Sequence, residues 1–252
     1  MDKAFSTVAT QLSFDYNMPL SFLLDNENHF SIYKPQEGRR RFEDNPEVFL
    51  KMAVFNGKVV ATGKEEGVKA IKEIVGERRG DWIFDGGTLS RIIMMLSTHN
   101  RRLEMVHPFF VKEKKSNKER GNLSYRIIEK EEIEKYRDDD DFSEAFAFDE
   151  NAPDEIGVAI MEKGEIVSIA GASSDSPLMW QVGVNTKPKY RGKEYGKIAV
   201  DILSDIVIDR GHLPFYGTAF SHISSMNVAL SSFFRPMWIE LTTNQLSILY
   251  TS

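Results

Sequence analysis

The order of apolar and polar residues predicts alternating strands and helices in the first half of the chain. A run of β-branched and aromatic residues ends at Asn56-Gly57 and a second apolar run follows at once, which is the pattern of a β-hairpin. Further along, apolar residues recur at helical spacing and then give way to short runs of strand character. We expect strands over 48–55 and 58–61, a helix over 64–75, a strand over 82–84, a helix over 89–96 and a strand over 105–111.

The second half alternates in the same way and contains one especially regular helix. Ile198, Ile202 and Ile206 repeat every four positions, and Gly211 follows as a C-terminal stop. The turn 162–164 joins two apolar runs into another hairpin. We expect strands over 124–128, 157–161, 165–171, 179–184, 214–218, 237–242 and 246–250, and helices over 129–136, 197–209 and 221–232.

Three segments are harder to interpret. Residues 1–45 show no regular period, and within them Arg39-Arg40-Arg41 is either a solvated loop or helix end or a contact for an anionic ligand. Residues 85–88, Asp-Gly-Gly-Thr, are either a tight turn with Thr88 as the helix N-cap or a small anion-binding turn, without the Lys and spacing of a P-loop. The charged run 112–120 is expected to be a linker or an exposed hairpin tip.

The composition is that of a globular protein and excludes several classes. The 252 residues are 41% hydrophobic and 28% charged, with a net charge of −6. No run approaches the roughly 18 apolar residues of a membrane span, and Met1 to Leu20 is no secretory leader. The absence of cysteine removes disulfides, thiolate metal sites and a cysteine nucleophile, and fits a reducing compartment. We therefore expect a cytoplasmic protein.

Charge is divided unevenly along the chain. Residues 1–120 carry a net charge of +3, and residues 121–252 carry −9. We expect an N-terminal α/β domain over the first range and a second domain over the other. The isoelectric point near 5.5 argues against a dedicated nucleic-acid binder, whose affinity would come from cations that neutralise phosphates.

The scarce cations of the second half gather at one turn. Five of its 12 basic residues fall between Lys187 and Lys197, where a strand runs through a turn into the regular helix. Such a junction directs backbone N–H groups and the positive end of the helix toward one point, and Gly192 and Gly196 let a ligand approach closely. The pattern predicts a site for a phosphate-containing cofactor; the alternative is an ordinary helix start with solvated lysines.

At this turn the sequence resembles the GNAT superfamily of acyl-CoA-dependent N-acetyltransferases. The family signature, Arg/Gln-x-x-Gly-x-Gly/Ala between a strand and a helix, is matched by Arg191-Gly-Lys-Glu-Tyr-Gly196. The hairpin 157–171, the strand 214–218 and Phe233-Phe234 before a final strand agree with the same pattern, so the resemblance covers about residues 124–252. It is most similar to a bacterial branch that carries an extra N-terminal α/β region. The resemblance implies a mixed α/β (α+β) fold with a central mixed sheet flanked by helices.

The resemblance also implies acetyl-CoA as co-substrate and no metal. Backbone near Val184 and Thr186 would pair with the pantetheine arm like an added strand, in a gap between splayed strands. Ser225 and Asn227, on the following helix, would bind the same arm, unless that helix face is simply solvated. The pyrophosphate would lie against the signature residues Arg191, Gly192, Lys193, Glu194, Tyr195, Gly196 and Lys197.

Two positions depart from the family pattern. The central glycine of the signature is Glu194, whose charge is unfavourable beside a pyrophosphate unless the side chain points to solvent. Where many members have a tyrosine acid, this chain has Ala229, and the family's common asparagine is His222.

Candidate catalytic residues follow from the chemistry, which needs a base for the amine and an acid for the departing thiolate. His222 is the histidine that the alignment places near the acyl group; the alternative is a capping or CoA-contacting residue. Tyr216 is the candidate acid, with a core tyrosine as the alternative. Asp175 and Glu155 are further candidates for orienting the amine.

The acceptor is expected to be the primary amine of a small molecule. Residues 138–155 are rich in carboxylates, and 138–162 contains no Lys or Arg. If this stretch lines the acceptor entrance, it would attract a cationic amine; otherwise it is a solvated loop. The second functional hypothesis is a catalytically decayed module that binds CoA or senses a ligand. Neither nucleic acid nor a membrane is expected as a partner, and a homodimer stays open.

Overall fold

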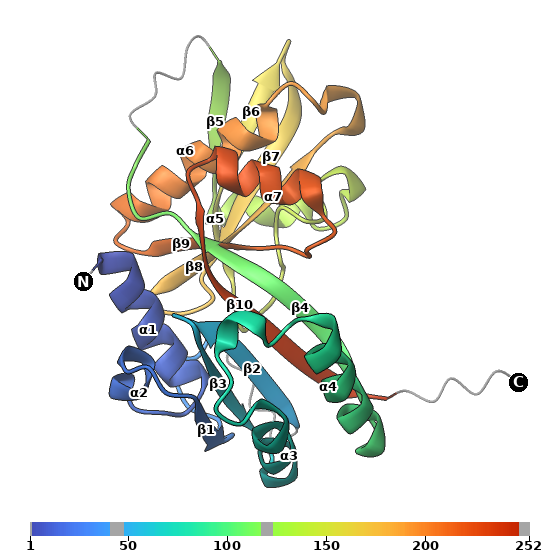
Figure 1. Cartoon of the computed structure of the whole chain (residues 1–252). Helices are drawn as coiled ribbons and strands as arrows, with labels where there is room; N and C mark the ends of the chain where they lie inside the picture. The colour runs from blue at the N-terminus through green and yellow to red at the C-terminus, as the bar shows by residue number, and fades with distance from the viewer. Residues whose placement is uncertain (1, 41–47, 117–122, 247–252) are drawn as a thin grey trace, which may run out of the picture.

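A ten-stranded mixed sheet runs through the part of the chain that the structure describes. The computed structural model describes residues 2–40, 48–116 and 123–246, and its strands follow the spatial order β1-β3-β2-β10-β4-β9-β8-β7-β6-β5 (Figure 1). The strands are β1 His29–Ile32, β2 Leu50–Phe55, β3 Lys58–Gly63, β4 Arg101–Val111, β5 Ser124–Glu129, β6 Asp154–Glu162, β7 Glu165–Ser173, β8 Met179–Thr186, β9 Leu213–Gly217 and β10 Arg235–Gln245. The mixed α/β class expected from the sequence is confirmed.

Strands from the two halves of the sequence are interleaved at the centre of the sheet. The last strand, β10, lies between β2 and β4, and β4 pairs with β9. The expected division at Gly121 lies outside the described residues, and the two-domain organisation stays a prediction. The central strands therefore bring residues of both halves onto one surface.

Helices cover both faces of the sheet, and alternation along β4 identifies which helix packs where. Phe109 and Val111 contact the core under α1, whereas Phe110 and Val106 contact the cores under α6 and under α3 and α4. We call these the α1 face and the α6 face. The principal helices are α1 Lys3–Asp15, α2 Leu20–Leu24, α3 Glu65–Val75, α4 Gly86–Thr98, α5 Lys130–Ile133, α6 Tyr195–Asp209 and α7 Ile223–Ser231.

Most expected elements occur at or near their expected positions, with two corrections in the first half. Residues 82–84 are not a strand: Gly80–Trp82 forms a 3-10 turn held by a hydrogen bond from Gly80 N–H to the Gly57 carbonyl. The N-cap of α4 is Asp85 rather than Thr88, because the Asp85 carboxylate accepts the Thr88 N–H.

The N- and C-terminal regions also differ from expectation. Residues 1–45, which showed no period, contain α1, α2 and β1. Helix α7 begins at Ile223, two residues after the expected start, because His222 is its N-cap. The expected strand 237–242 is part of the longer β10, whereas the strand expected over 246–250 lies almost wholly outside the described residues.

Lys112, the first residue of the charged run that was expected to be a linker or an exposed hairpin tip, is buried. Lys112 is 1% exposed, and its ammonium group contacts Asp201 and Asp205 of α6 at 2.7 and 2.8 Å and the Ser204 hydroxyl at 2.8 Å. Three partners satisfy the three ammonium hydrogens, which offsets the cost of burying the charge. This cluster ties β4 to α6. Within the described residues, no helix is long and apolar enough to cross a membrane.

Candidate active site

Strands β8 and β9 separate at the centre of the sheet and leave a gap. Their parallel pairing is limited to Met179, Trp180 and Gln181 of β8, opposite 213–215 of β9. Beyond Gln181 the β8 residues 182–186 have no partner on β9, although they remain paired with β7 on the other side. Val184 and Thr186 lie on this unpaired edge. Their backbone groups on that side are therefore open to a ligand that pairs like a strand.

The basic turn leads from this edge directly into α6. Gly192 and Glu194 adopt left-handed backbone conformations, with φ of +78° and +63°. Glu194 is the N-cap of α6 but does not cap it with its side chain, so the first N–H groups of the helix have no capping side chain. A Cβ at Gly196 would lie 2.9 Å from Thr186 Oγ1, and glycine there lets the helix start press against β8. The turn thus forms a cradle of N–H groups.

Arg191 differs from the other basic residues of the turn. Lys187 and Lys189 each lie 3.2 Å from Glu165, and Lys193 lies 3.6 Å from Glu162. Hydrogen bonds from Tyr190, Lys189 and Lys187 lower the pKa of Glu165 to about 2. Lys197 is paired with Glu194 at 2.6 Å, and the Glu194 side chain is 66% exposed. In the described chain the Arg191 guanidinium contacts the Thr186 carbonyl and no carboxylate. It is the cation of the turn that is available to a phosphate.

Tyr216 lies beside the gap on the α6 face. Its hydroxyl is 2.9 Å from Ser225 Oγ of α7, and its ring packs in the core under α6. Burial raises the pKa of Tyr216, the hydrogen bond with Ser225 lowers it, and the charge of Glu144 raises it further. The phenol is therefore protonated at neutral pH and can donate a hydrogen bond. The other two α7 candidates, His222 and Asn227, are exposed, and Ala229 is buried.

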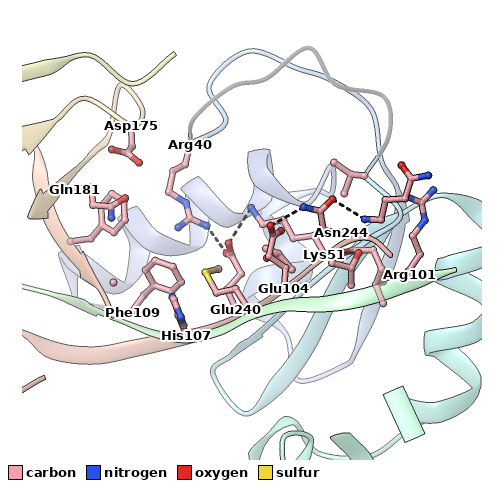
Figure 2. Close-up of a pocket in the computed structure, with 18 residues that line it drawn as sticks. Arg40, Lys51, Arg101, Glu104, His107, Phe109, Asp175, Gln181, Glu240 and Asn244 are labelled. Carbon is pink, nitrogen blue, oxygen red and sulfur yellow. Dashed lines mark hydrogen bonds and ion pairs between the residues drawn. The ribbon is translucent and has the colours of Figure 1, made fainter. Parts of the chain in front are cut away.

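A cavity of about 820 Å³ opens on the α1 face, beside the gap (Figure 2). At one end lie Asp175, Gln181 and Gly217, next to the point where β8 and β9 separate. Residues of β2, β4 and β10 form most of the rest of its wall, so both halves of the sequence contribute. The wall combines apolar side chains with the charged groups Arg40, Lys51, Arg101, Glu104, Asp175 and Glu240 together with His107. Burial lowers the pKa of His107 and so favours its neutral form.

Arg40 anchors this wall, which corrects the interpretation of Arg39 and Arg40 as a solvated loop. Its guanidinium contacts Asp15 of α1 at 2.5 Å and Glu240 of β10 at 2.7 Å, and Lys51 lies 3.2 Å from the other oxygen of Glu240. Arg39 is also buried and donates to the Asp15 carbonyl. Arg41 lies outside the described residues. The basic segment is thus a buried structural anchor (Figure 2).

The same network predicts a specific acid sensitivity. Burial would raise the pKa of Glu240, but Arg40 and Lys51 hold it at about 2, against 4.5 for an ordinary glutamate. The folded chain therefore binds this proton more weakly than the unfolded chain, so the stabilisation is full above about pH 4.5 and is lost as pH falls toward 2. We expect Glu240→Gln to flatten the acid-side fall of the free energy of unfolding in urea titrations. Equal slopes for the variant and the parent would contradict this.

Comparison with known proteins identifies the family. A model of the family described as GNAT acetyltransferase matches residues 53–231. The chain belongs to the GNAT acetyltransferase family. The match begins in β2 and ends with α7, so it includes strands of the N-terminal half that the signature alone did not reach. No curated protein matches the chain significantly.

Solved structures similar to this GNAT chain share little sequence with it. A GNAT-family protein from Novosphingobium aromaticivorans is 16% identical with a TM-score of 0.44, over 57% of this chain and 66% of that one. A GCN5-related N-acetyltransferase-like protein from Streptococcus suis is 17% identical with a TM-score of 0.42, over 61% and 67%. A Salmonella typhimurium protein solved with its cofactor acetyl-CoA is 16% identical with a TM-score of 0.30, over 38% and 66%. The chain thus spans about two thirds of their length, and the likeness concerns the fold alone.

The structure gathers some of the sequence candidates and separates others. Val184, Thr186 and residues 191–197 form one continuous surface, with Tyr216 and Ser225 beside the gap. Glu155 pairs with Lys130 at 2.7 Å, and the His222 side chain makes no hydrogen bond, ion pair or ring contact within the described residues. Gln181, Glu144 and the N-terminal wall of the cavity were not among the site residues expected from the sequence. No group of metal-ligating residues occurs in the described ranges, and independence from metal stays a prediction.

Proposed function

We propose that this GNAT-family chain transfers an acetyl group from acetyl-CoA to a primary amine of a small molecule. The observation that carries the proposal is the unpaired edge of β8, which runs into the N–H cradle at the start of α6. Arg191, which contacts no carboxylate within the described chain, lies beside that cradle. Acetyl-CoA fits that combination. Its extended pantetheine arm carries amide groups that can pair with the strand edge, and its pyrophosphate can bind at the helix start.

The residues around the gap suit acyl transfer by positioning. Pairing with Val184 and Thr186 would hold the thioester between β8 and β9, and the cavity on the α1 face would admit the amine to the same gap. Holding both reactants in place can account for a large part of the rate enhancement. Tyr216, protonated because its pKa is raised, would donate to the thiolate as it departs, and Ser225 would hold its hydroxyl in place. The proposal includes a cationic amine as the acceptor and a cytoplasmic location for the protein.

A second candidate function is a module that binds CoA without turnover. It is favoured by Ala229, which is buried and carries no acid where many relatives have a tyrosine. Both functions predict that acetyl-CoA raises the melting temperature, because a ligand that binds only the native state stabilises it. Release of free thiol in the presence of spermidine, L-lysine or kanamycin separates them. Turnover with any of these amines excludes the module that only binds, and no thermal shift at millimolar acetyl-CoA removes both.

Charge reversal at Arg191 tests where the pyrophosphate lies. Arg191→Glu replaces the cation that is available to phosphate with a carboxylate, and we expect the Kd for acetyl-CoA to rise about 10-fold or more, since charge-assisted contacts contribute about 1.5–3 kcal/mol. Isothermal titration calorimetry measures this. Arg210→Glu, the same change just beyond the other end of α6, is the control and should leave the Kd unchanged. Equal affinity of Arg191→Glu and the parent would mean that the pyrophosphate lies elsewhere.

A further inference from the structure

Three glycines on neighbouring strands form a stripe across the α1 face. Gly157 of β6 is paired with Gly171 of β7, which is paired with Gly183 of β8. A Cβ at Gly171 would lie 2.1 Å from the Ala145 carbonyl oxygen, and one at Gly183 would lie 2.3 Å from that of Glu144. The stripe therefore lets the backbone of residues 144–145 lie directly on the sheet. It fixes this segment next to the edge of β8 that faces the gap.

Glu144 is the charged residue that this packing brings to the gap. Its N–H donates to Asn185 Oδ1 at 2.6 Å, which secures it to β8. With Gln181 and Gly183 it lines a smaller cavity of about 290 Å³, and Gln181 also lines the large cavity of Figure 2. Its charge influences Tyr216, which lies on the opposite face of the sheet at the same gap. Glu144 and Tyr216 thus flank the place where the thioester is proposed to lie.

The carboxylate of Glu144 has no hydrogen bond or ion pair within the described chain, unlike those of Asp154 and Glu155. Asp154 accepts the N–H groups of Ala147 and Phe148 at 3.1 and 2.8 Å. Glu155 is paired with Lys130 at 2.7 Å. Those carboxylates hold the segment together, whereas the Glu144 carboxylate is exposed and points to no partner of its own. Such a group is available to an incoming cation.

We propose that Glu144 is the residue that receives the acceptor: its carboxylate binds the amine at the gap and takes its proton during the transfer. This assignment rests on the proposed function. The amine attacks in its neutral form, after its ammonium proton has been lost to solvent. As the N–C bond forms, one further N–H proton passes to Glu144, directly or through a water molecule. The C–S bond then breaks, and the sulfur leaves with a proton donated by Tyr216. Glu144 returns its proton to solvent, Tyr216 is reprotonated from solvent, and the products are the N-acetyl amine and free CoA.

Glu144→Gln tests the assignment, because it keeps the size of the side chain and removes the base. With spermidine, L-lysine and kanamycin as acceptors, we expect kcat/KM for the amine to fall about 100-fold, in the range that a positioned base contributes. The KM for acetyl-CoA and the melting temperature should not change, and Glu144→Asp should recover part of the activity. Glu150→Gln, an exposed carboxylate of the same acidic stretch, is the matched control and should behave like the parent.

The outcomes separate this assignment from the function on which it rests. If the parent protein releases no thiol with any of the three amines, the proposed function fails and the role of Glu144 fails with it. If the parent is active and Glu144→Gln stays within threefold of it, the function stands and the assignment is wrong. An equal, salt-dependent loss in Glu144→Gln and Glu150→Gln would also overturn it, because it would show that the stretch acts only through its overall charge.

Discussion

Arg40→Met is expected to lower the free energy of unfolding by about 3–5 kcal/mol, because it breaks a buried ion network from one side. The guanidinium is the shared partner of Asp15 and Glu240, whose side chains are 1% and 5% exposed. Burial lowers the pKa of Arg40, but the two carboxylates raise it far above its usual range, so the charge is permanent. Methionine would fill much of the space, but it would leave the buried carboxylate of Asp15 without the guanidinium and that of Glu240 with Lys51 alone.

Urea unfolding followed by circular dichroism measures this loss. Arg79→Met is the control, since Arg79 pairs with Asp81 at the surface with 79% of its side chain exposed, and such pairs contribute about 0–1 kcal/mol. If Arg40→Met does not fold, Arg40→Lys provides the comparison: it keeps the charge but cannot contact both carboxylates with one planar fork, and should lose less. A loss below about 1 kcal/mol for Arg40→Met would contradict the role of the network.

The parts of the site that the sequence predicts are those built from neighbouring residues. Helix α6 follows from isoleucines four positions apart, and the cradle follows from glycines and cations within ten residues of one another. The left-handed conformation of Glu194 explains why the signature usually has glycine there, where a side chain is strained. Local spacing determines these features, so the pattern is sufficient to find them.

The cavity wall could not be predicted, because its contacts join residues far apart in the chain. Arg40 and Glu240 are 200 positions apart, and a run of three arginines at the level of sequence resembles a solvated loop. Helix α1 buries Ala4, Val8 and Leu12 at helical spacing, but apolar residues on its other side obscure that period. The burial of Arg40 and the buried face of α1 are both set by contacts with residues that are distant in the sequence.

The sequence contains a signal that points to Glu144, but the signal can be interpreted only when the pairing of the strands is known. The acidic stretch shows many carboxylates, and nothing in their order distinguishes one that is free from those that bind Lys130 or backbone N–H groups. The glycines at 157, 171 and 183 are the useful pattern, since one glycine on each of three neighbouring strands indicates that something passes close above the sheet. Only the pairing of the strands shows that the segment passing there is the acidic one.

Gly171→Ala is therefore expected to remove most of the activity without touching either substrate. The new methyl carbon would lie 2.1 Å from the Ala145 carbonyl oxygen and 2.6 Å from two ring carbons of Phe146, so the segment must move away from the sheet. Overpacking of this kind costs about 1–3 kcal/mol of stability. A shift of about 1 Å in Glu144 can cost about 100-fold in turnover, because the amine and its base no longer align.

Two measurements and a double variant distinguish displacement of Glu144 from general damage. The kcat for amine acetylation should fall about 100-fold, and the Kd for acetyl-CoA should be retained, because Gly171 is on β7 and the gap lies between β8 and β9. Gly86→Ala is the control, since a Cβ there meets nothing within 4 Å, and it should match the parent in both kcat and Kd. Adding Glu144→Gln to Gly171→Ala should cause little further loss, because both changes remove the same group from the gap. Full additivity of the two losses would instead mean that the glycine stripe supports activity by a route independent of Glu144.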